Sequence, residues 1–75
     1  MSKSLISIDV LGDRCPIPVK KIRKVLKQYP KGSVIHVLGD DPESLHDIPI
    51  LLLRLGLEPA VISEEEIGWK FIICN

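Results

Sequence analysis

One stretch of the chain holds the residues best suited to chemistry. It reads Gly12-Asp13-Arg14-Cys15-Pro16-Ile17-Pro18 and lies where a predicted strand ends and a predicted helix begins. We place Cys15 at the N-cap of that helix and Pro16 at its first position, which proline favours. The free amides of a first helical turn favour an anion, so a thiol there is expected to ionise below the roughly 8.5 of a free cysteine. The sequence therefore predicts a reactive cysteine.

The neighbours of this thiol bear on its ionisation. Arg14 and Lys20 add positive potential. Pro18 removes one first-turn amide, which leaves the N–H groups of Ile17 and Val19 as donors that could reach the sulfur. On spacing alone, a second interpretation is equally good: the cysteine is a small apolar residue that fills the corner between strand and helix.

Other cysteine chemistry finds less support in the sequence. The only other cysteine, Cys74, lies at the far end of the chain, so a Cys-x-x-Cys dithiol is excluded. His36 and His46 stand in no motif that would make either a base for Cys15, and we interpret both as partly exposed structural residues. A metal site would need all four side chains to converge, against the local pairs typical of structural zinc. A lone cysteine suits a carrier that accepts and passes on a group, and thiol exchange requires no metal or organic cofactor.

Hydrophobic periodicity predicts the elements that position the cysteine. Residues Leu5 to Val10 alternate as a half-buried strand does. A helix follows from Pro16 until Pro30 and Gly32 end it, and its apolar stripe comprises Val19, Ile22, Val25, Leu26 and Tyr29. Three further strands are predicted at Val34–Leu38, Ala60–Ser63 and Trp69–Cys74, the last two joined as a hairpin through residues 64–68. In the last strand, Trp69, Phe71 and Ile73 form a core face.

The second helix is interrupted by a proline. Asp41 is expected to cap it, and the apolar stripe comprises Leu45, Ile48, Leu52 and Leu55, ending at Gly56. Pro49 lacks an N–H and would clash with the carbonyl of Leu45, whereas Asp47 can cap a fresh start. We therefore expect a short turn and then the main helix from about Ile48.

These elements define a single small domain over residues 1–75. Right-handed crossovers make the first three strands parallel and place both helices on one face of the sheet. The 45% hydrophobic content excludes a disordered chain, and no apolar run approaches the ~20 residues of a membrane span. Residues 1–4 lack the apolar region of a signal peptide. We expect a soluble cytoplasmic protein.

The charges cancel in sum but are sorted along the chain. Between Asp13 and Asp40 there are seven basic residues and no acid, whereas residues 40–66 hold eight acids and one arginine. Such an asymmetry steers encounters with acidic partners or RNA, or it is only the solvated face of a helix.

The chain resembles the TusA/SirA family of sulfur-carrier proteins over essentially its full length. The resemblance rests on Cys-Pro-x-Pro after Gly12, a basic helix, Asp40-Asp41-Pro42, Asp47-Ile48-Pro49, Gly56 and the closing hairpin. It implies an α+β fold: a two-layer βαβαββ sandwich similar to the C-terminal domain of translation initiation factor three. It also implies a mixed four-stranded sheet whose last strand runs antiparallel.

The resemblance implies a function as well. Family members accept sulfane sulfur as a persulfide on the motif cysteine, here Cys15, from a cysteine desulfurase or a rhodanese, and pass it to an acceptor relay protein. Relays in the family lead to 2-thiouridine in tRNA, sulfur oxidation, molybdenum-cofactor supply or selenium metabolism. Such a carrier is a sulfurtransferase without turnover of the ordinary enzymatic kind.

The resemblance extends to a few further residues. Arg23 and Asp41 match docking positions of the family, and we extend the docking role to Lys20 and Lys24; a solvated helix charge and a helix cap are the simpler interpretations. Asp47 and Pro49 are interpreted as shaping the second helix. The chain departs from the family at Asp13, where an apolar residue is usual. We expect its charge to limit the lowering of the Cys15 pKa.

Two other functions compete with the sulfur carrier. The first is an RNA-binding or regulatory module that uses the basic helix, but the chain has only one Trp, one Tyr and one Phe, too few for a base-stacking platform. The second is a structural adaptor that docks through charge alone. We expect protein donors and acceptors of sulfur as partners, with no direct nucleic-acid binding and no membrane association.

Overall fold

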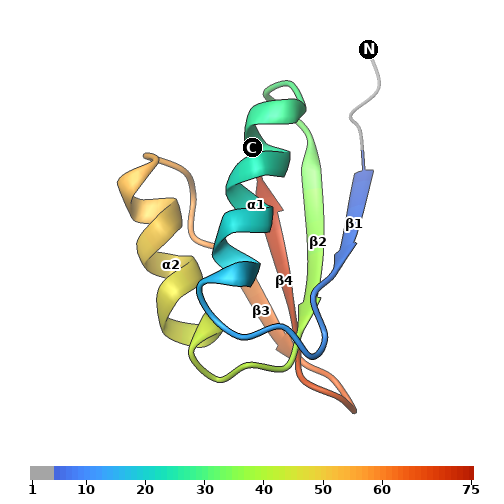
Figure 1. Cartoon of the computed structure of the whole chain (residues 1–75). Helices are drawn as coiled ribbons and strands as arrows, with labels where there is room; N and C mark the ends of the chain where they lie inside the picture. The colour runs from blue at the N-terminus through green and yellow to red at the C-terminus, as the bar shows by residue number, and fades with distance from the viewer. Residues whose placement is uncertain (1–4) are drawn as a thin grey trace.

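The computed structural model describes residues 5–75, which form a four-stranded sheet with two helices on one face (Figure 1). The strands are β1 (Leu5–Asp9), β2 (Val34–Gly39), β3 (Val61–Glu64) and β4 (Trp69–Cys74), and the helices are α1 (Ile17–Gln28) and α2 (Ser44–Arg54). The order βαβαββ and the two layers confirm the expected α+β sandwich. Residues 1–4, considered above for a signal peptide, lie outside the described residues.

The sheet is mixed, with the strand order β1-β2-β4-β3. β1 pairs with β2 in parallel, and β4 pairs antiparallel with both β2 and β3. The first three strands therefore run in one direction and the last strand in the other, as expected. Because β1 and β2 are parallel neighbours, the loops that follow them leave the same end of the sheet. This arrangement positions the candidate site.

The core lies between the sheet and the helices. A row across three strands, Ile6, Ile35 and Ile73, is in register and faces the helices. The fully buried side chains of the core include Ile22, Ile35, Val37, Ile48, Phe71 and Ile73. Phe71 and Ile73 thus form the expected core face, with Trp69 packed against its margin. Tyr29, expected in the buried stripe of α1, is exposed, because it follows the helix with an extended backbone.

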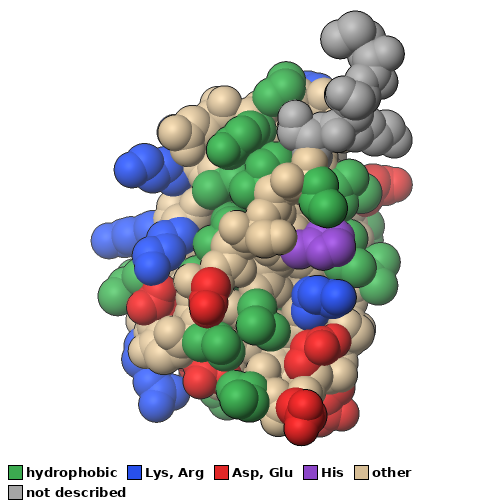
Figure 2. All heavy atoms as spheres, turned by 90° about the vertical axis from the view of Figure 1, so that its right-hand side faces the viewer, with side chains coloured by type: hydrophobic (Ala, Val, Ile, Leu, Met, Phe, Trp, Pro, Cys, Tyr) green, Lys and Arg blue, Asp and Glu red, His purple; other side chains and the backbone are tan. Residues whose placement is uncertain are grey.

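Within residues 5–75, no helix covers the opposite face of the sheet (Figure 1). Ser7, His36 and Ile72 lie in register on this face, since they alternate with the core residues of their strands. Figure 2 views the molecule from the side of β1 and shows hydrophobic side chains beside a histidine and charges of both signs. His36 is therefore half-buried on the open face, away from the helices.

Helix α2 is continuous, so the expected break near Pro49 is wrong. The residues before it already form a turn, in which the Ser44 and Leu45 amides donate to the carbonyls of Asp41 and Pro42 at 2.9 and 3.1 Å. Because α2 begins at Ser44, the carbonyl that Pro49 leaves without a donor belongs to the first turn. The turn and the expected main helix therefore join into one element.

The remaining element boundaries differ from expectation by one or two residues. β1 ends at Asp9 rather than Val10, β2 extends to Gly39, and β3 is shifted to begin at Val61. Such differences are usual at element ends. Among residues 5–75, neither helix has the length and apolar character needed to cross a membrane.

Candidate functional site

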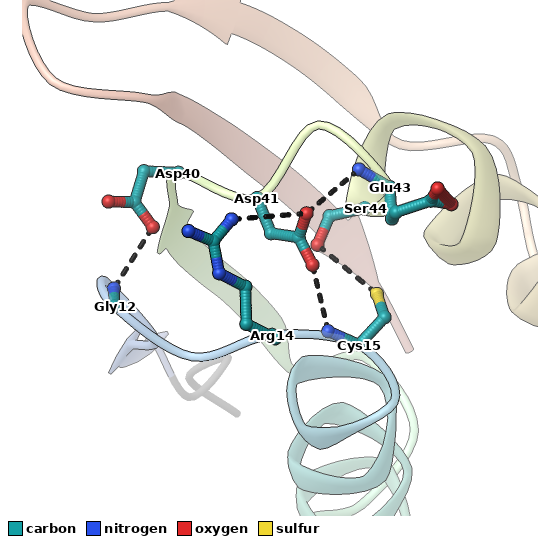
Figure 3. Close-up of polar contacts among 7 residues, drawn as sticks. All are labelled: Gly12, Arg14, Cys15, Asp40, Asp41, Glu43 and Ser44. Atoms are coloured by element: carbon teal, nitrogen blue, oxygen red, sulfur yellow. Dashed lines mark hydrogen bonds and ion pairs between the residues drawn. The ribbon is translucent and has the colours of Figure 1, made fainter.

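The candidate site is formed by two loops at one end of the sheet. Cys15 lies in the loop between β1 and α1, and residues 40–43 form the loop between β2 and α2. Figure 3 shows Asp40 and Asp41 of the second loop directed toward Gly12 and Cys15 of the first loop. Ser44, the first residue of α2, is also directed toward Cys15 (Figure 3). Asp40 Oδ1 accepts a hydrogen bond from the Gly12 N–H at 2.9 Å. The acidic motif of the second loop thus holds the cysteine loop in place.

Asp41 makes the contacts that fix the backbone of the cysteine. Its Oδ2 accepts the Cys15 N–H at 2.8 Å, and its Oδ1 accepts the Glu43 N–H at 3.1 Å. The Arg14 guanidinium lies 4.0 Å from the same carboxylate. The two amide hydrogen bonds, that from Cys15 first, hold the pKa of Asp41 below its usual value, so the carboxylate is ionised at neutral pH.

This arrangement changes the roles expected for Asp41. The carboxylate does cap a turn, but α2 begins three residues later, at Ser44. The residue is 4% exposed, which leaves its side chain little surface for a partner. The structure therefore shows Asp41 positioning Cys15, and a docking role for it stays a prediction.

Cys15 does not occupy the helix N-cap, contrary to the sequence-based expectation. Helix α1 begins at Ile17 with Pro16 as its N-cap. The Ile17 N–H donates to the Arg14 carbonyl at 2.9 Å and so is used within a turn before the helix. Because Pro16 and Pro18 have no N–H, this turn leaves few amides to face the sulfur. No backbone amide is among the causes of the Cys15 pKa shift, so the expected stabilisation of a thiolate by the first-turn amides is not found.

The sulfur instead faces the start of α2. Cys15 Sγ lies 3.8 Å from Ser44 Oγ, and Ser44 is only 1% exposed. Cys15 itself is half-buried. Ser44 was not among the residues predicted from the sequence, although its place three residues after Asp41, next to the acidic motif, was a usable signal.

The environment raises the pKa of the Cys15 thiol to about 11, whereas the sequence analysis expected it to fall. Burial is the largest cause, and the next is the side chain of Asp47, which favours the protonated form. Ser44 acts in the opposite direction, and the charges of Asp47 and Asp41 raise the pKa further. The thiol is therefore protonated at neutral pH in the free protein. Asp47, which we had interpreted as shaping α2, also acts on the sulfur.

The charged residues next to Cys15 in sequence act elsewhere. The Arg14 side chain is 80% exposed and reaches Asp41 rather than the sulfur. Asp13, expected to oppose ionisation of the thiol, is paired with Lys21 at 2.6 Å. Neither Arg14 nor Asp13 is among the causes of the Cys15 shift. Lys20, Arg23 and Lys24 are exposed on α1, as a docking surface requires.

A groove between the two helices begins beside the cysteine loop. Its lining comprises Pro16, Val19, Arg23, Asp47, Ile50, Leu51, Arg54 and Leu55. Five of these residues are apolar, and the charged ones are Arg23 from α1 and Asp47 and Arg54 from α2. Since Pro16 and Asp47 line the groove and also neighbour Cys15, a chain lying in it would pass close to the sulfur.

The other candidate residues lie away from this site. Cys74 is exposed at the end of β4, where it pairs in register with Val34 near the start of β2. The site lies beyond the opposite end of β2. His46 is exposed on α2 and His36 is on the open sheet face. The structure thus brings Asp41, Ser44 and Asp47 to Cys15, but neither histidine is among the groups that act on its thiol.

Comparisons with known proteins agree on one family. The family model described as sulfurtransferase TusA matches residues 6–75. Two proteins of Archaeoglobus fulgidus, each described as a putative sulfur carrier protein, are similar to this chain. One is 33% identical and covers 92% of this chain and 94% of its own length. The other is 38% identical, and the match covers 88% of this chain and 87% of that protein.

A solved structure shows the same fold. The crystal structure of a SirA-like protein from Desulfitobacterium hafniense matches with a TM-score of 0.79 and 30% sequence identity. The match covers 92% of this chain and 93% of that one.

Proposed function

Since the chain belongs to the TusA family of sulfur carriers, we propose that Cys15 holds sulfur as a persulfide and relays it from a donor protein to an acceptor protein. The observation that carries this proposal is the position of Cys15. Its backbone is held by the buried Asp41 carboxylate, the residue is half-buried, and its neighbour Pro16 lines the helix groove. A cysteine so placed has a fixed backbone and remains partly open to a partner.

The transfer is two successive thiol-exchange steps. In the first, the Cys15 thiolate attacks the terminal sulfur of a donor persulfide, and the donor cysteine leaves as a thiolate with the electrons of the broken S–S bond. In the second, an acceptor thiolate attacks the terminal sulfur on Cys15. The S–S bond breaks and its electron pair stays on Cys15 Sγ. Neither step needs an external oxidant, a metal or an organic cofactor.

The raised pKa of Cys15 makes the first step depend on the donor. In the free protein the thiol is protonated at neutral pH, and the thiolate is the nucleophile. A base or a positive charge that the donor brings as it docks would increase the thiolate fraction and speed this step. The protonated state protects the free carrier from unwanted reactions of its thiol.

The exposed cations of α1 suit the docking step. Lys20, Arg23 and Lys24 project from the helix that begins beside Cys15, and Arg23 also lines the groove. A donor or acceptor with an acidic surface would be steered to this face, and an apolar segment could occupy the groove. Transient contacts of this kind allow the carrier to serve two partners in turn.

The cytoplasm is the compartment in which we place this relay. The destination of the sulfur is one of those that the family serves, with thiolation of tRNA the first to test. Each copy of the protein takes up and releases one sulfur, so its activity is measured as loading and discharge rather than as turnover alone.

Intact-mass measurement after incubation with a cysteine desulfurase and cysteine tests the proposal. We expect the wild-type chain to gain one sulfur atom, Cys74→Ser to gain it equally, and Cys15→Ser to gain none. Because Cys74 is exposed but lies away from the groove, it is the matched control for Cys15. Uptake by Cys15→Ser with none by Cys74→Ser would reverse the assignment. If none of the three proteins took up sulfur from a desulfurase or a rhodanese, the carrier function would be lost.

A further inference from the structure

The Ser44 hydroxyl has a position that a purely structural residue would not require. It belongs to the first residue of α2, it is 1% exposed, and the hydrogen-bonding partner that the structure gives it is Cys15 Sγ at 3.8 Å. A buried hydroxyl ordinarily has a hydrogen-bonding partner. Here that partner is the reacting atom of the proposed carrier.

The direction of this contact changes with the charge of the sulfur. With a neutral thiol, either the S–H or the O–H group can donate. A thiolate has no proton and can only accept, so Ser44 must then be the donor. Hydrogen bonds to a charged acceptor are about twice as strong as neutral ones. The contact therefore gains strength as negative charge appears on the sulfur.

We propose that Ser44 acts directly on the reacting sulfur: its hydroxyl donates to Cys15 Sγ whenever that atom carries negative charge. The inference rests on the proposed function of Cys15, since charge appears there twice in the relay. It is present on the attacking thiolate during loading and on the leaving thiolate during discharge. One buried hydroxyl thus supports both steps.

The other groups around the sulfur act against its ionisation or at a greater distance. Burial disfavours the thiolate most, and the carboxylates of Asp47 and Asp41 add to this effect. Arg14 lies near Asp41 with an exposed side chain. Within this set, Ser44 is the group that favours the ionised sulfur, since its hydrogen bond lowers the pKa of Cys15.

Alkylation of Cys15 by a small neutral reagent tests the inference in the full-length protein. The comparison is made in a Cys74→Ser background, so that only one thiol reacts, and on the rising limb of rate against pH. Ser44→Ala is expected to move this limb toward higher pH. For each unit that the pKa rises, the thiolate fraction falls tenfold while the nucleophilicity of each thiolate increases, so the net rate falls about threefold.

The direction of this change separates the inference from mere loosening of the loop. A loosened loop would expose the thiol, reduce its burial and make alkylation faster. Ser33→Ala is the matched control, because Ser33 is also 1% exposed but donates to the Pro30 carbonyl at 2.8 Å, away from the site. It should leave the Cys15 profile unchanged. Ser44→Thr retains the hydroxyl and should alkylate close to the wild-type rate.

Cyanolysis of the loaded protein tests the discharge step. Cyanide attacks the terminal sulfur, thiocyanate forms, and Cys15 is released as a thiolate, so Ser44→Ala should discharge about threefold more slowly for each unit of pKa rise in the leaving thiol. If the wild-type protein accepts no sulfur, the carrier function fails while the alkylation comparison still tests Ser44. The inference is overturned if Ser44→Ala alkylates as fast as wild type or faster, or if Ser33→Ala slows alkylation as much.

Discussion

At the residue scale, the backbone and the sulfur of Cys15 are controlled by different groups. Asp41 accepts the Cys15 N–H at 2.8 Å and so fixes where the residue lies. Asp47 and Ser44 act on the sulfur with opposite signs. Asp41 belongs to the loop between β2 and α2, and Ser44 and Asp47 belong to α2. The position and the ionisation of Cys15 therefore both depend on the contact between its own loop and the start of α2.

Asp47→Asn is predicted to make the Cys15 thiol more reactive. The substitution removes a negative charge and exchanges one carboxylate oxygen for an NH2 group, which can only donate, so the pKa of Cys15 should fall from about 11. The alkylation profile should move to lower pH. Each unit of decrease raises the thiolate fraction tenfold on the rising limb and the net rate about threefold, since nucleophilicity falls with pKa.

The control for this prediction is Asp13→Asn, which removes a carboxylate near Cys15 in sequence but paired with Lys21 in space. It should leave the profile in place. An unchanged or slower rate for Asp47→Asn would show that Asp47 does not raise the pKa of Cys15.

The sequence could identify Cys15 as the candidate residue but could not predict its ionisation. Cys-Pro-x-Pro at the end of a strand marks the residue locally. The groups that set its pKa lie 26 residues or more further along the chain, and only the parallel pairing of β1 and β2 brings them together. The expected lowering also assumed an N-cap position, which the turn ending at Ile17 prevents.

At the scale of elements, the β3–β4 hairpin supports the loop that holds Cys15. Gly68, just before β4, has a φ of 77°, and its backbone packs directly against the end of β2. A Cβ atom there would clash with the Gly39 carbonyl oxygen and lie 2.9 Å from Asp40 Cα. Asp40 begins the loop that anchors Gly12 and Cys15, so the contact of Gly68 with this segment helps to fix the position of that loop.

Gly68→Ala is predicted to destabilise the protein by about 2–4 kcal/mol, because a left-handed backbone conformation and a clash with rigid backbone add together. Thermal and urea unfolding would measure the loss. Gly56→Ala is the matched control: Gly56 has a φ of 72° but nothing within 4 Å of an added Cβ. Gly56→Ala should lower the free energy of unfolding only by the cost of the left-handed conformation, about 1–2 kcal/mol. Equal losses for both variants would show that the contact with Gly39 contributes nothing.

Elements were predictable wherever their pattern was local and regular. The alternating strand at residues 5–9, the amphipathic helix and the last strand follow from periodicity, because each buries one face against the same core. Pro49 was misleading because its local effect is unfavourable in any helix. Its position near the start of α2 limits the loss to one hydrogen bond, and burial of Ile48, Leu51 and Leu52 keeps the helix in place.

At the scale of the whole molecule, the sorted charges place five of the ten Lys and Arg residues on α1. Lys20 lies in the half of α1 next to Cys15, Arg23 and Lys24 lie near its middle, and Lys27 and Lys31 lie at or beyond its other end. The acids of residues 40–66 lie on other elements. The molecule therefore presents a basic surface beside its reactive residue, which an acidic partner could recognise by long-range attraction.

Reversal of two charges tests whether this surface docks protein partners. Arg23→Glu with Lys24→Glu should slow sulfur uptake from a desulfurase, with a larger loss at low salt than at high salt, where screening is stronger. At low salt we expect a loss of roughly tenfold or more in rate, the scale of electrostatic steering. Alkylation by a small neutral reagent should change little, because neither residue is among the causes of the Cys15 shift.

Lys27→Glu with Lys31→Glu provides the matched control and separates the carrier from an RNA-binding protein. It makes the same change of net charge further from Cys15, since Lys27 lies about 6 Å beyond Arg23 along the helix axis and Lys31 lies beyond the end of α1, so a partner that must reach Cys15 should be affected less. An RNA-binding protein that uses the whole basic helix would lose tRNA affinity with either pair, show a steep salt dependence and retain binding in Cys15→Ser. Equal loss of sulfur uptake from both pairs would mean that net charge, rather than a docking surface beside Cys15, governs the encounter.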